Sequence, residues 1–169
     1  MRDHKIEERV RDDLSQVTEW LLLGGEISDA EHMSRLAAQG VTTVINAACE
    51  VSDRKLCERY SLGYYHLYWY DDQQTKFAHQ FLHALGWVGN EEAKRASEGR
   101  QLRLYVHCQM GVNRGPLIAT FLLAARQGIS ADEAWERIKA SHPVAESFDK
   151  LVYREACLCA LEEYSQRAS

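Results

Sequence analysis

A cysteine and an arginine separated by five residues are the part of this sequence best suited to chemistry. The stretch Val106-His-Cys-Gln-Met-Gly-Val-Asn-Arg-Gly-Pro116 places Cys108 and Arg114 between an apolar run and a helix-like segment. That spacing can close a tight loop around one phosphate-sized anion, with a thiolate beneath the anion, a guanidinium beside it and backbone N–H groups around it. The sequence therefore predicts a loop that holds a phosphate-like group against a cysteine.

The length and composition are those of one soluble domain. The chain has 169 residues, of which 46% are hydrophobic, and it carries a formal charge of −5. An acidic chain without a concentrated basic surface argues against general binding to nucleic acid or to an anionic membrane. Residues 1–10 lack the apolar region of a secretory signal, and the longest apolar run, 116–125, is too short to span a membrane. We expect a cytoplasmic monomer.

The cysteines are consistent with a reducing compartment. There are five of them, an odd set without zinc-type pairing: Cys49, Cys57, Cys108, Cys157 and Cys159. Cys157 and Cys159 lack both the C-x2-C spacing and a second pair, and we expect both to be packing residues. We expect no metal and no cofactor.

Strand and helix signals alternate along a single predicted domain, residues 15–165, which follows a charged arm or short helix at 1–14. Ser28 with Glu31, and Ser130 with Glu133, have the spacing of capping boxes. Strands are expected at about 17–23, 41–45, 64–70 and 102–106. Helices are expected at about 29–39, 53–60, 75–96, 117–127, 131–140 and 147–164.

This order predicts an α/β fold with a mostly parallel central sheet flanked by helices. The strand at 102–106 leads directly into the Cys108 loop, and Pro116 suits the first turn of the helix that follows. Loops that leave the carboxyl ends of parallel strands are where such sheets bind ligands. The Cys108 loop is therefore the predicted site.

With the strand, the H-C-x5-R loop and the helix in place, the chain resembles the cysteine-dependent protein-tyrosine phosphatases, most closely the small dual-specificity branch. The resemblance covers most of residues 16–160 and includes Trp20–Gly25, Val41–Asn46 and the strand ending at Asp72. It implies the phosphatase fold, with the signature loop between a central strand and a helix. It also implies metal-independent hydrolysis of phosphomonoesters through a cysteinyl-phosphate intermediate.

The resemblance gives individual residues their expected roles. Cys108 is the nucleophile, and Arg114 clamps two phosphoryl oxygens through its planar fork. Asp72 is the general acid and then the general base, with Asp71 as the competing candidate. His107 supports the loop from behind and favours the thiolate. The rest of the phosphate loop consists of Gln109, Met110, Gly111, Val112 and Asn113.

One departure from the family pattern bears on turnover, and the charge of the loop bears on substrate. Gly115 stands where the family usually has serine or threonine, whose hydroxyl helps the thiolate leave in the second step. The loop side chains carry no positive charge apart from Arg114, which disfavours an inositol phospholipid. We expect a phosphorylated protein as substrate, with phosphotyrosine first and phosphoserine or phosphothreonine as further candidates.

Several alternatives stay open on sequence alone. Asn113 before Arg114 occurs in RNA 5′-triphosphatases that use the same loop, although the acidic charge counts against RNA. Gly115 would suit a phosphate-binding pseudophosphatase or scaffold, and a rhodanese-like sulfurtransferase would not need Asp72. Cys49 is either a redox partner of Cys108 or a half-buried packing residue. The aromatic residues 68–70 either line the cleft or pack in and beside the core.

Overall fold

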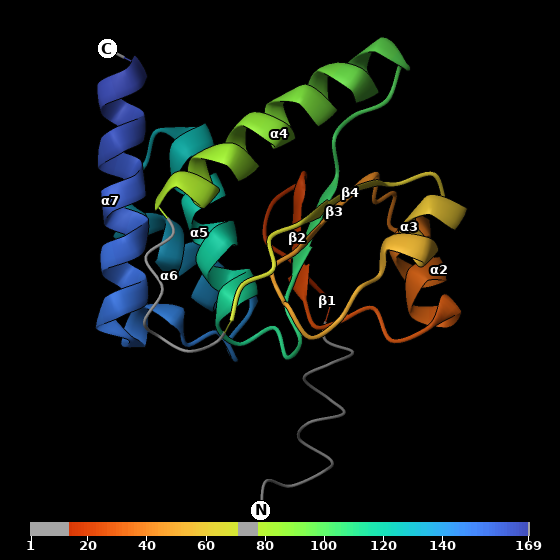
Figure 1. Ribbon diagram of the computed structural model, residues 1–169, viewed down its shortest axis with the longest axis horizontal. Coiled ribbons are helices and arrows are strands. Elements are labelled where there is room, and N and C mark those ends of the chain that lie inside the picture. Colours follow the sequence, from red (N-terminus) through yellow and green to blue (C-terminus); the bar gives the residue numbers. More distant parts are fainter. Residues whose placement is uncertain (1–13, 71–77, 169) are drawn as a thin grey trace, which may run out of the picture.

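The strands of the described chain form one five-stranded sheet in the order β1-β2-β5-β3-β4 (Figure 1). The computed structural model describes residues 14–70 and 78–168. The strands are β1 Leu14–Gln16, β2 Leu21–Gly24, β3 Thr43–Asn46, β4 Gly63–His66 and β5 Leu104–His107. β1 pairs antiparallel with β2, and the other pairs are parallel. The predicted α/β class with a mostly parallel sheet is confirmed.

Helices cover both faces of the sheet (Figure 1). Two short helices, α2 Ala30–Ala38 and α3 Arg54–Arg59, pack on one face. The opposite face carries α4 Ala78–Ser97, α5 Arg114–Gln127, α6 Ala131–Ser141 and α7 Leu151–Ala168. Alternation along the strands separates the two cores, because Leu21 and Leu23 face the larger helical layer and Leu22 faces the smaller one.

The central helix of the larger layer is α5. Its sequence is apolar on all sides, and every residue from Arg114 to Ala124 is buried. A helix of that composition packs inside a protein rather than on its surface. It ends at Gly128, which adopts a left-handed conformation with φ of 65°. Its buried setting fixes the position of its first residue, Arg114, relative to the sheet.

Two strands are shorter than the sequence predicted. The expected strand at 17–23 starts only at Leu21, because the hydroxyl of Thr18 accepts hydrogen bonds from Trp20 and Leu21 and closes a turn. The expected strand at 64–70 stops at His66, because Tyr68 has a φ of 56° and breaks the extended run. In both places a local turn overrides β propensity.

Helix starts were predicted with mixed success. The hydroxyl of Ser130 accepts a hydrogen bond from the Glu133 N–H at 3.1 Å, so that N-cap is confirmed. The cap predicted at Ser28 was wrong by one residue, since the Asp29 carboxylate accepts from the His32 N–H at 2.8 Å. The helix predicted over 147–164 is divided into a 3-10 turn, Ser147–Asp149, and the longer α7.

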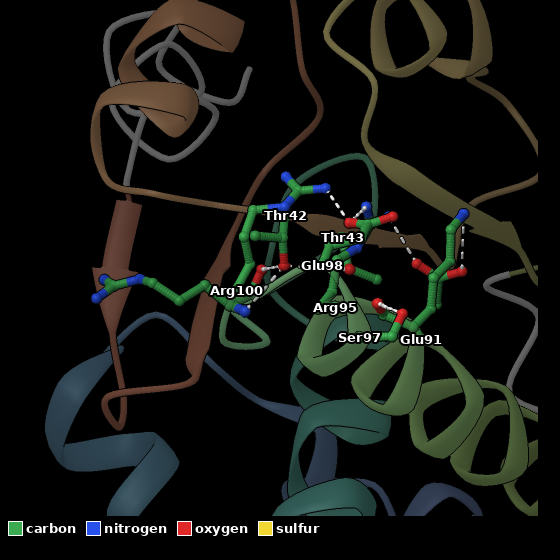
Figure 2. Close-up of polar contacts among 9 residues, drawn as sticks. Thr42, Thr43, Glu91, Arg95, Ser97, Glu98 and Arg100 are labelled. Atoms are coloured by element: carbon green, nitrogen blue, oxygen red, sulfur yellow. Dashed lines mark hydrogen bonds and ion pairs between the residues drawn. The ribbon is translucent and has the colours of Figure 1, made fainter.

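A buried arginine near the end of α4 forms ion pairs beside the start of β4, at the end of the parallel strands away from the Cys108 loop. The side chain of Arg95 is 3% exposed and contacts Glu91 at 2.8 Å and Glu98 at 3.2 Å (Figure 2). Glu91 lies directly over Gly63, where an added Cβ would be 2.3 Å from its carboxylate. Gly63 therefore leaves the space in which this ion pair forms.

None of the helices in residues 14–70 and 78–168 combines the length and the hydropathy that a membrane-spanning segment needs.

Replacing Gly63 by alanine should destabilise the fold. The new methyl group displaces the Glu91 carboxylate from the buried Arg95, and we expect a loss of about 1–2 kcal/mol in the free energy of unfolding. Urea denaturation would measure it. Gly89→Ala in α4 is the matched control, because no atom lies within 4 Å of the added Cβ, and it should be neutral or stabilising by up to about 1 kcal/mol. Equal stability of the two variants would contradict this account.

Candidate active site

The Cys108 loop lies where the sequence placed it, between a central strand and a buried helix. β5 pairs with β2 on one side and β3 on the other and ends at His107, while α5 starts at Arg114. Residues 108–113 form the connection at the carboxyl edge of the parallel strands. The amino terminus of α5 adjoins this loop, and the N–H groups of a helix start favour a bound anion.

The loop packs backbone against backbone on the end of β2. Gly111 has a φ of 70°, and a Cβ on it would lie 2.8 Å from the carbonyl carbon of Gly24. The Glu26 N–H also donates a hydrogen bond to the Gln109 carbonyl at 3.1 Å. Glycine is needed at 111 both for its left-handed conformation and for this close approach.

Arg114 is buried and held from two directions. Its Nη1 donates to Oε2 of Glu50 and to the carbonyl of Trp69, both at 2.7 Å, and the side chain is 4% exposed. Burial raises the pKa of Glu50, but the hydrogen bonds that its carboxylate accepts and the nearby charge of Arg114 together hold that pKa below its usual value. A fixed guanidinium presents a planar fork of donors at the loop. Sequence reasoning found Arg114 and missed Glu50.

Asp71 and Asp72 lie outside the described residues, but the segment that leads to them is anchored beside Arg114. The Trp69 carbonyl accepts from Arg114 and also from the Cys49 N–H at 3.2 Å. The Trp69 indole is buried and donates to the side chain of Gln80 in α4. Trp69 is therefore held against both Arg114 and α4.

His107 lies fully buried behind Cys108, as expected of a supporting residue. Its Nδ1 donates to the Cys108 carbonyl at 3.1 Å, and its Nε2 is 2.7 Å from Oδ2 of Asp53. Asp53 is also buried and accepts a hydrogen bond from the Asn46 side chain at 3.2 Å. The ring thus lies between the Cys108 carbonyl and the Asp53 carboxylate. Asp53 was not identified from the sequence.

The other cysteines differ in environment from Cys108. Burial, followed by the nearby Glu50, raises the pKa of Cys49, which disfavours the thiolate needed for attack on an oxidised Cys108. Burial raises the pKa of Cys157 to about 12, in line with a packing role. Cys159 is exposed, so its predicted packing role was wrong. It lies on the outer surface of α7 next to the exposed Leu158, whereas Cys157 and Ala160 face the core.

The aromatic residues 68–70 divide between core and surface. Trp69 packs on Phe81 with ring centroids 5.0 Å apart, whereas Tyr68 and Tyr70 are exposed. Within the described ranges, no three His, Cys, Asp or Glu side chains gather as they would around a metal ion. Arg114 and the amino terminus of α5 suit the loop to binding an oxyanion.

Comparison with known proteins gives a family match over most of the chain. Residues 22–152 match the model described as dual specificity phosphatase, catalytic domain. No curated protein matches the sequence. Human DUSP28 is similar in structure, with a TM-score of 0.69, 19% identity and coverage of 92% of this chain and 94% of that chain.

Two further solved structures show the same fold. PTPMT1 in complex with PI(5)P has a TM-score of 0.77 and 18% identity, covering 92% of this chain and 99% of that chain. A mouse putative dual specificity phosphatase complexed with zinc tungstate has a TM-score of 0.73 and 18% identity, covering 92% and 90%. At these identities the likeness is one of fold.

Gly111→Ala should abolish oxyanion binding, because the added Cβ collides with the backbone of Gly24 and displaces the loop. A tungstate titration followed by calorimetry would measure the binding. Gly128→Ala is the control: it also has a positive φ, but nothing lies within 4 Å of its added Cβ. Both variants should lose roughly 1 kcal/mol of stability from the backbone conformation alone. Tungstate affinity should fall only in Gly111→Ala, and unchanged affinity there would contradict the packing argument.

Proposed function

Because this chain belongs to the dual specificity phosphatase family, we propose that it hydrolyses phosphate monoesters on proteins through a cysteinyl-phosphate intermediate at Cys108. The proposal rests on one observation: two separate parts of the fold hold the residues of the Cys108 loop. β5 and α5 position Cys108 and Arg114 in it, and Trp69 links Arg114 to the segment that contains Asp72.

The proposed first step transfers the phosphoryl group to sulfur. The Cys108 thiolate attacks phosphorus, a sulfur–phosphorus bond forms, and the bond to the ester oxygen breaks. Asp72 gives its proton to the departing oxygen, which leaves as an alcohol or phenol. Arg114 and the loop N–H groups bind the equatorial oxygens, over which negative charge spreads in the transition state.

The second step hydrolyses the intermediate. Asp72, now ionised, takes a proton from water, and the water oxygen attacks phosphorus. The sulfur–phosphorus bond breaks, inorganic phosphate leaves and the Cys108 thiolate is restored. The two reaction steps together need two proton transfers by one carboxyl group and no redox partner.

Charge near the loop supports a phosphoprotein as substrate. The loop has four uncharged side chains, those of Gln109, Met110, Val112 and Asn113. The carboxylate of Glu50 accepts a hydrogen bond from Arg114 beside them. A multiply charged inositol lipid gains little from such surroundings and is repelled by the carboxylate. PTPMT1 was solved with PI(5)P, so a phosphoinositide is the comparison substrate that matters. We propose phosphotyrosine as the preferred residue, with phosphoserine and phosphothreonine as slower substrates.

Cys108→Ser should reduce hydrolysis of a small aryl phosphate by at least about 10⁴-fold, since the nucleophile is lost, while tungstate still binds. Asp72→Asn should slow esters with poor leaving groups most, because these depend on protonation. Steady-state assays over a series of aryl phosphates would measure both effects. Cys159→Ser, at an exposed cysteine, is the matched control and should be fully active. Full activity of Cys108→Ser would refute the mechanism.

Gly115 should make the second step slow. The position has no hydroxyl to assist the departing thiolate, and an added Cβ would lie only 3.2 Å from the Cys108 N–H nitrogen. Rapid mixing with an aryl phosphate should therefore give a burst of about one leaving group per site followed by slower turnover. Gly115→Ser should increase the steady rate relative to the burst if the loop moves by the few tenths of an ångström that the new atom needs.

The same experiment separates the enzyme from a phosphate-binding pseudophosphatase. A stalled protein stops after the burst, and a competent phosphatase continues. The dual specificity phosphatase match does not favour an RNA 5′-triphosphatase or a sulfurtransferase. Hydrolysis of triphosphorylated RNA at a higher kcat/KM than of phosphotyrosyl peptide would overturn the proposed substrate class.

A further inference from the structure

A segment that the proposed chemistry does not use lies against the outside of the phosphate loop. The segment runs from His142, directly after α6, to Ser147, the first residue of the 3-10 turn. Three consecutive loop carbonyls accept hydrogen bonds from it. The donors are His142 Nε2 to Gly111 at 2.8 Å, the Glu146 N–H to Val112 at 2.9 Å, and the Ser147 hydroxyl to Asn113.

The direction of these carbonyls sets the direction of the loop's N–H groups. In a trans peptide the C=O and the following N–H point to opposite sides of the chain, and no cis peptide occurs among the described residues. With the carbonyls of Gly111, Val112 and Asn113 turned outward, the N–H groups of the next residues turn inward. Those three N–H groups belong to Val112, Asn113 and Arg114, and they face the side on which a phosphoryl group would bind.

His142 is itself held in one orientation by a residue distant in sequence. The side chain is fully buried, and its Nδ1 lies 2.8 Å from the hydroxyl of Ser15 in β1. Since Nε2 donates to the Gly111 carbonyl, a neutral ring accepts at Nδ1 and the Ser15 hydroxyl donates. The Gly111 carbonyl, which can only accept, places a proton on Nε2, and the bond between the Ser15 hydroxyl and Nδ1 fixes the orientation of the ring. Ser15 is also buried, with 8% exposure, so water competes little for this bond.

Ser147 has a comparable position at the other end of the segment. It is fully buried, and its hydroxyl donates to the Asn113 carbonyl, the last one before the helix that carries Arg114. The Leu117 N–H donates to the same carbonyl at 3.0 Å in the first turn of α5. Ser147 and α5 together fix the peptide that joins Asn113 to Arg114.

We propose that His142, oriented by Ser15, and Ser147 are positioning residues of the reaction. They hold the Gly111 and Asn113 carbonyls outward, so that the N–H groups of Val112 and Arg114 bind the equatorial oxygens of the phosphoryl group. The proposal rests on the phosphatase function proposed above and assigns the loop's alignment to a second part of the chain. Without these donors the Gly111 carbonyl loses its His142 bond and the Asn113 carbonyl keeps only the bond from the Leu117 N–H. Both peptides then rotate more easily, and a rotated peptide presents a carbonyl oxygen to the anion.

The first test compares His142→Ala with His142→Gln. Alanine removes the donor, and glutamine keeps an N–H at a similar distance from the backbone as Nε2. His142→Ala should bind tungstate at least about 10-fold more weakly and lose a similar factor in kcat/KM for an aryl phosphate, as expected for a misplaced oxyanion donor. His142→Gln should recover most of both losses. Calorimetry and steady-state kinetics measure them.

Ser147→Ala and Ser147→Thr form a second pair that does not depend on the first. Alanine should weaken tungstate binding, and threonine, which keeps the hydroxyl, should restore it. His32→Leu is the control for loss of a buried histidine, because His32 is 1% exposed in α2 and packs edge-on against Tyr105. That variant should lose stability without losing tungstate affinity.

The outcomes separate this proposal from the function on which it rests. A folded His142→Ala protein with wild-type tungstate affinity and kcat/KM would overturn the positioning role while leaving the phosphatase intact. If His142→Ala does not fold, equal affinities of Ser147→Ala and Ser147→Thr would overturn it instead. A wild-type protein that neither binds tungstate nor hydrolyses aryl phosphate would overturn both proposals.

Discussion

The candidate site depends on one close contact between two backbones. Gly111 lies so near Gly24 that a single added carbon would fall 2.8 Å from the backbone of β2. This contact holds the connection between β5 and α5 down on the sheet edge, within six residues. Because the loop is short and fixed at both ends, Cys108 and Arg114 have little freedom, and their relative placement follows from the fold rather than from their own side chains.

Fixed placement has electrostatic consequences. The carboxylate of Glu50 and the carbonyl of Trp69 both accept from Nη1 of Arg114, so the guanidinium is oriented before any substrate binds. Behind the nucleophile, Asp53 and His107 form a buried contact at 2.7 Å. Preorganised charges and dipoles of this kind need no rearrangement when the reaction occurs, which is the usual source of rate enhancement in phosphoryl transfer.

What the sequence could predict follows from the range of the interactions involved. The strand, loop and helix around Cys108 were predictable because β5, the loop and α5 are contiguous and each carries a local signal. Glu50, Asp53, His142 and Ser147 were not, since each acts on a residue far away in the chain: Glu50 and Arg114 are 64 positions apart, and Ser15 and His142 are 127 apart. The ends of β2 and β4 were misjudged for another reason, because the Thr18 turn and the positive φ of Tyr68 outweigh strand propensity. Glu50 could have been suspected from one feature of the sequence, since it is an acidic residue shortly after the carboxyl end of β3.

If Cys108 is the nucleophile, the covalent intermediate on its sulfur can be observed directly. The protein is mixed rapidly with an aryl phosphate, quenched in acid during the burst, digested and mapped by mass spectrometry. We expect phosphate on the peptide that contains Cys108, at an occupancy that rises with the burst and falls when substrate is exhausted. Steady release of phosphate with an unmodified Cys108, or with the phosphate on another residue, would contradict it.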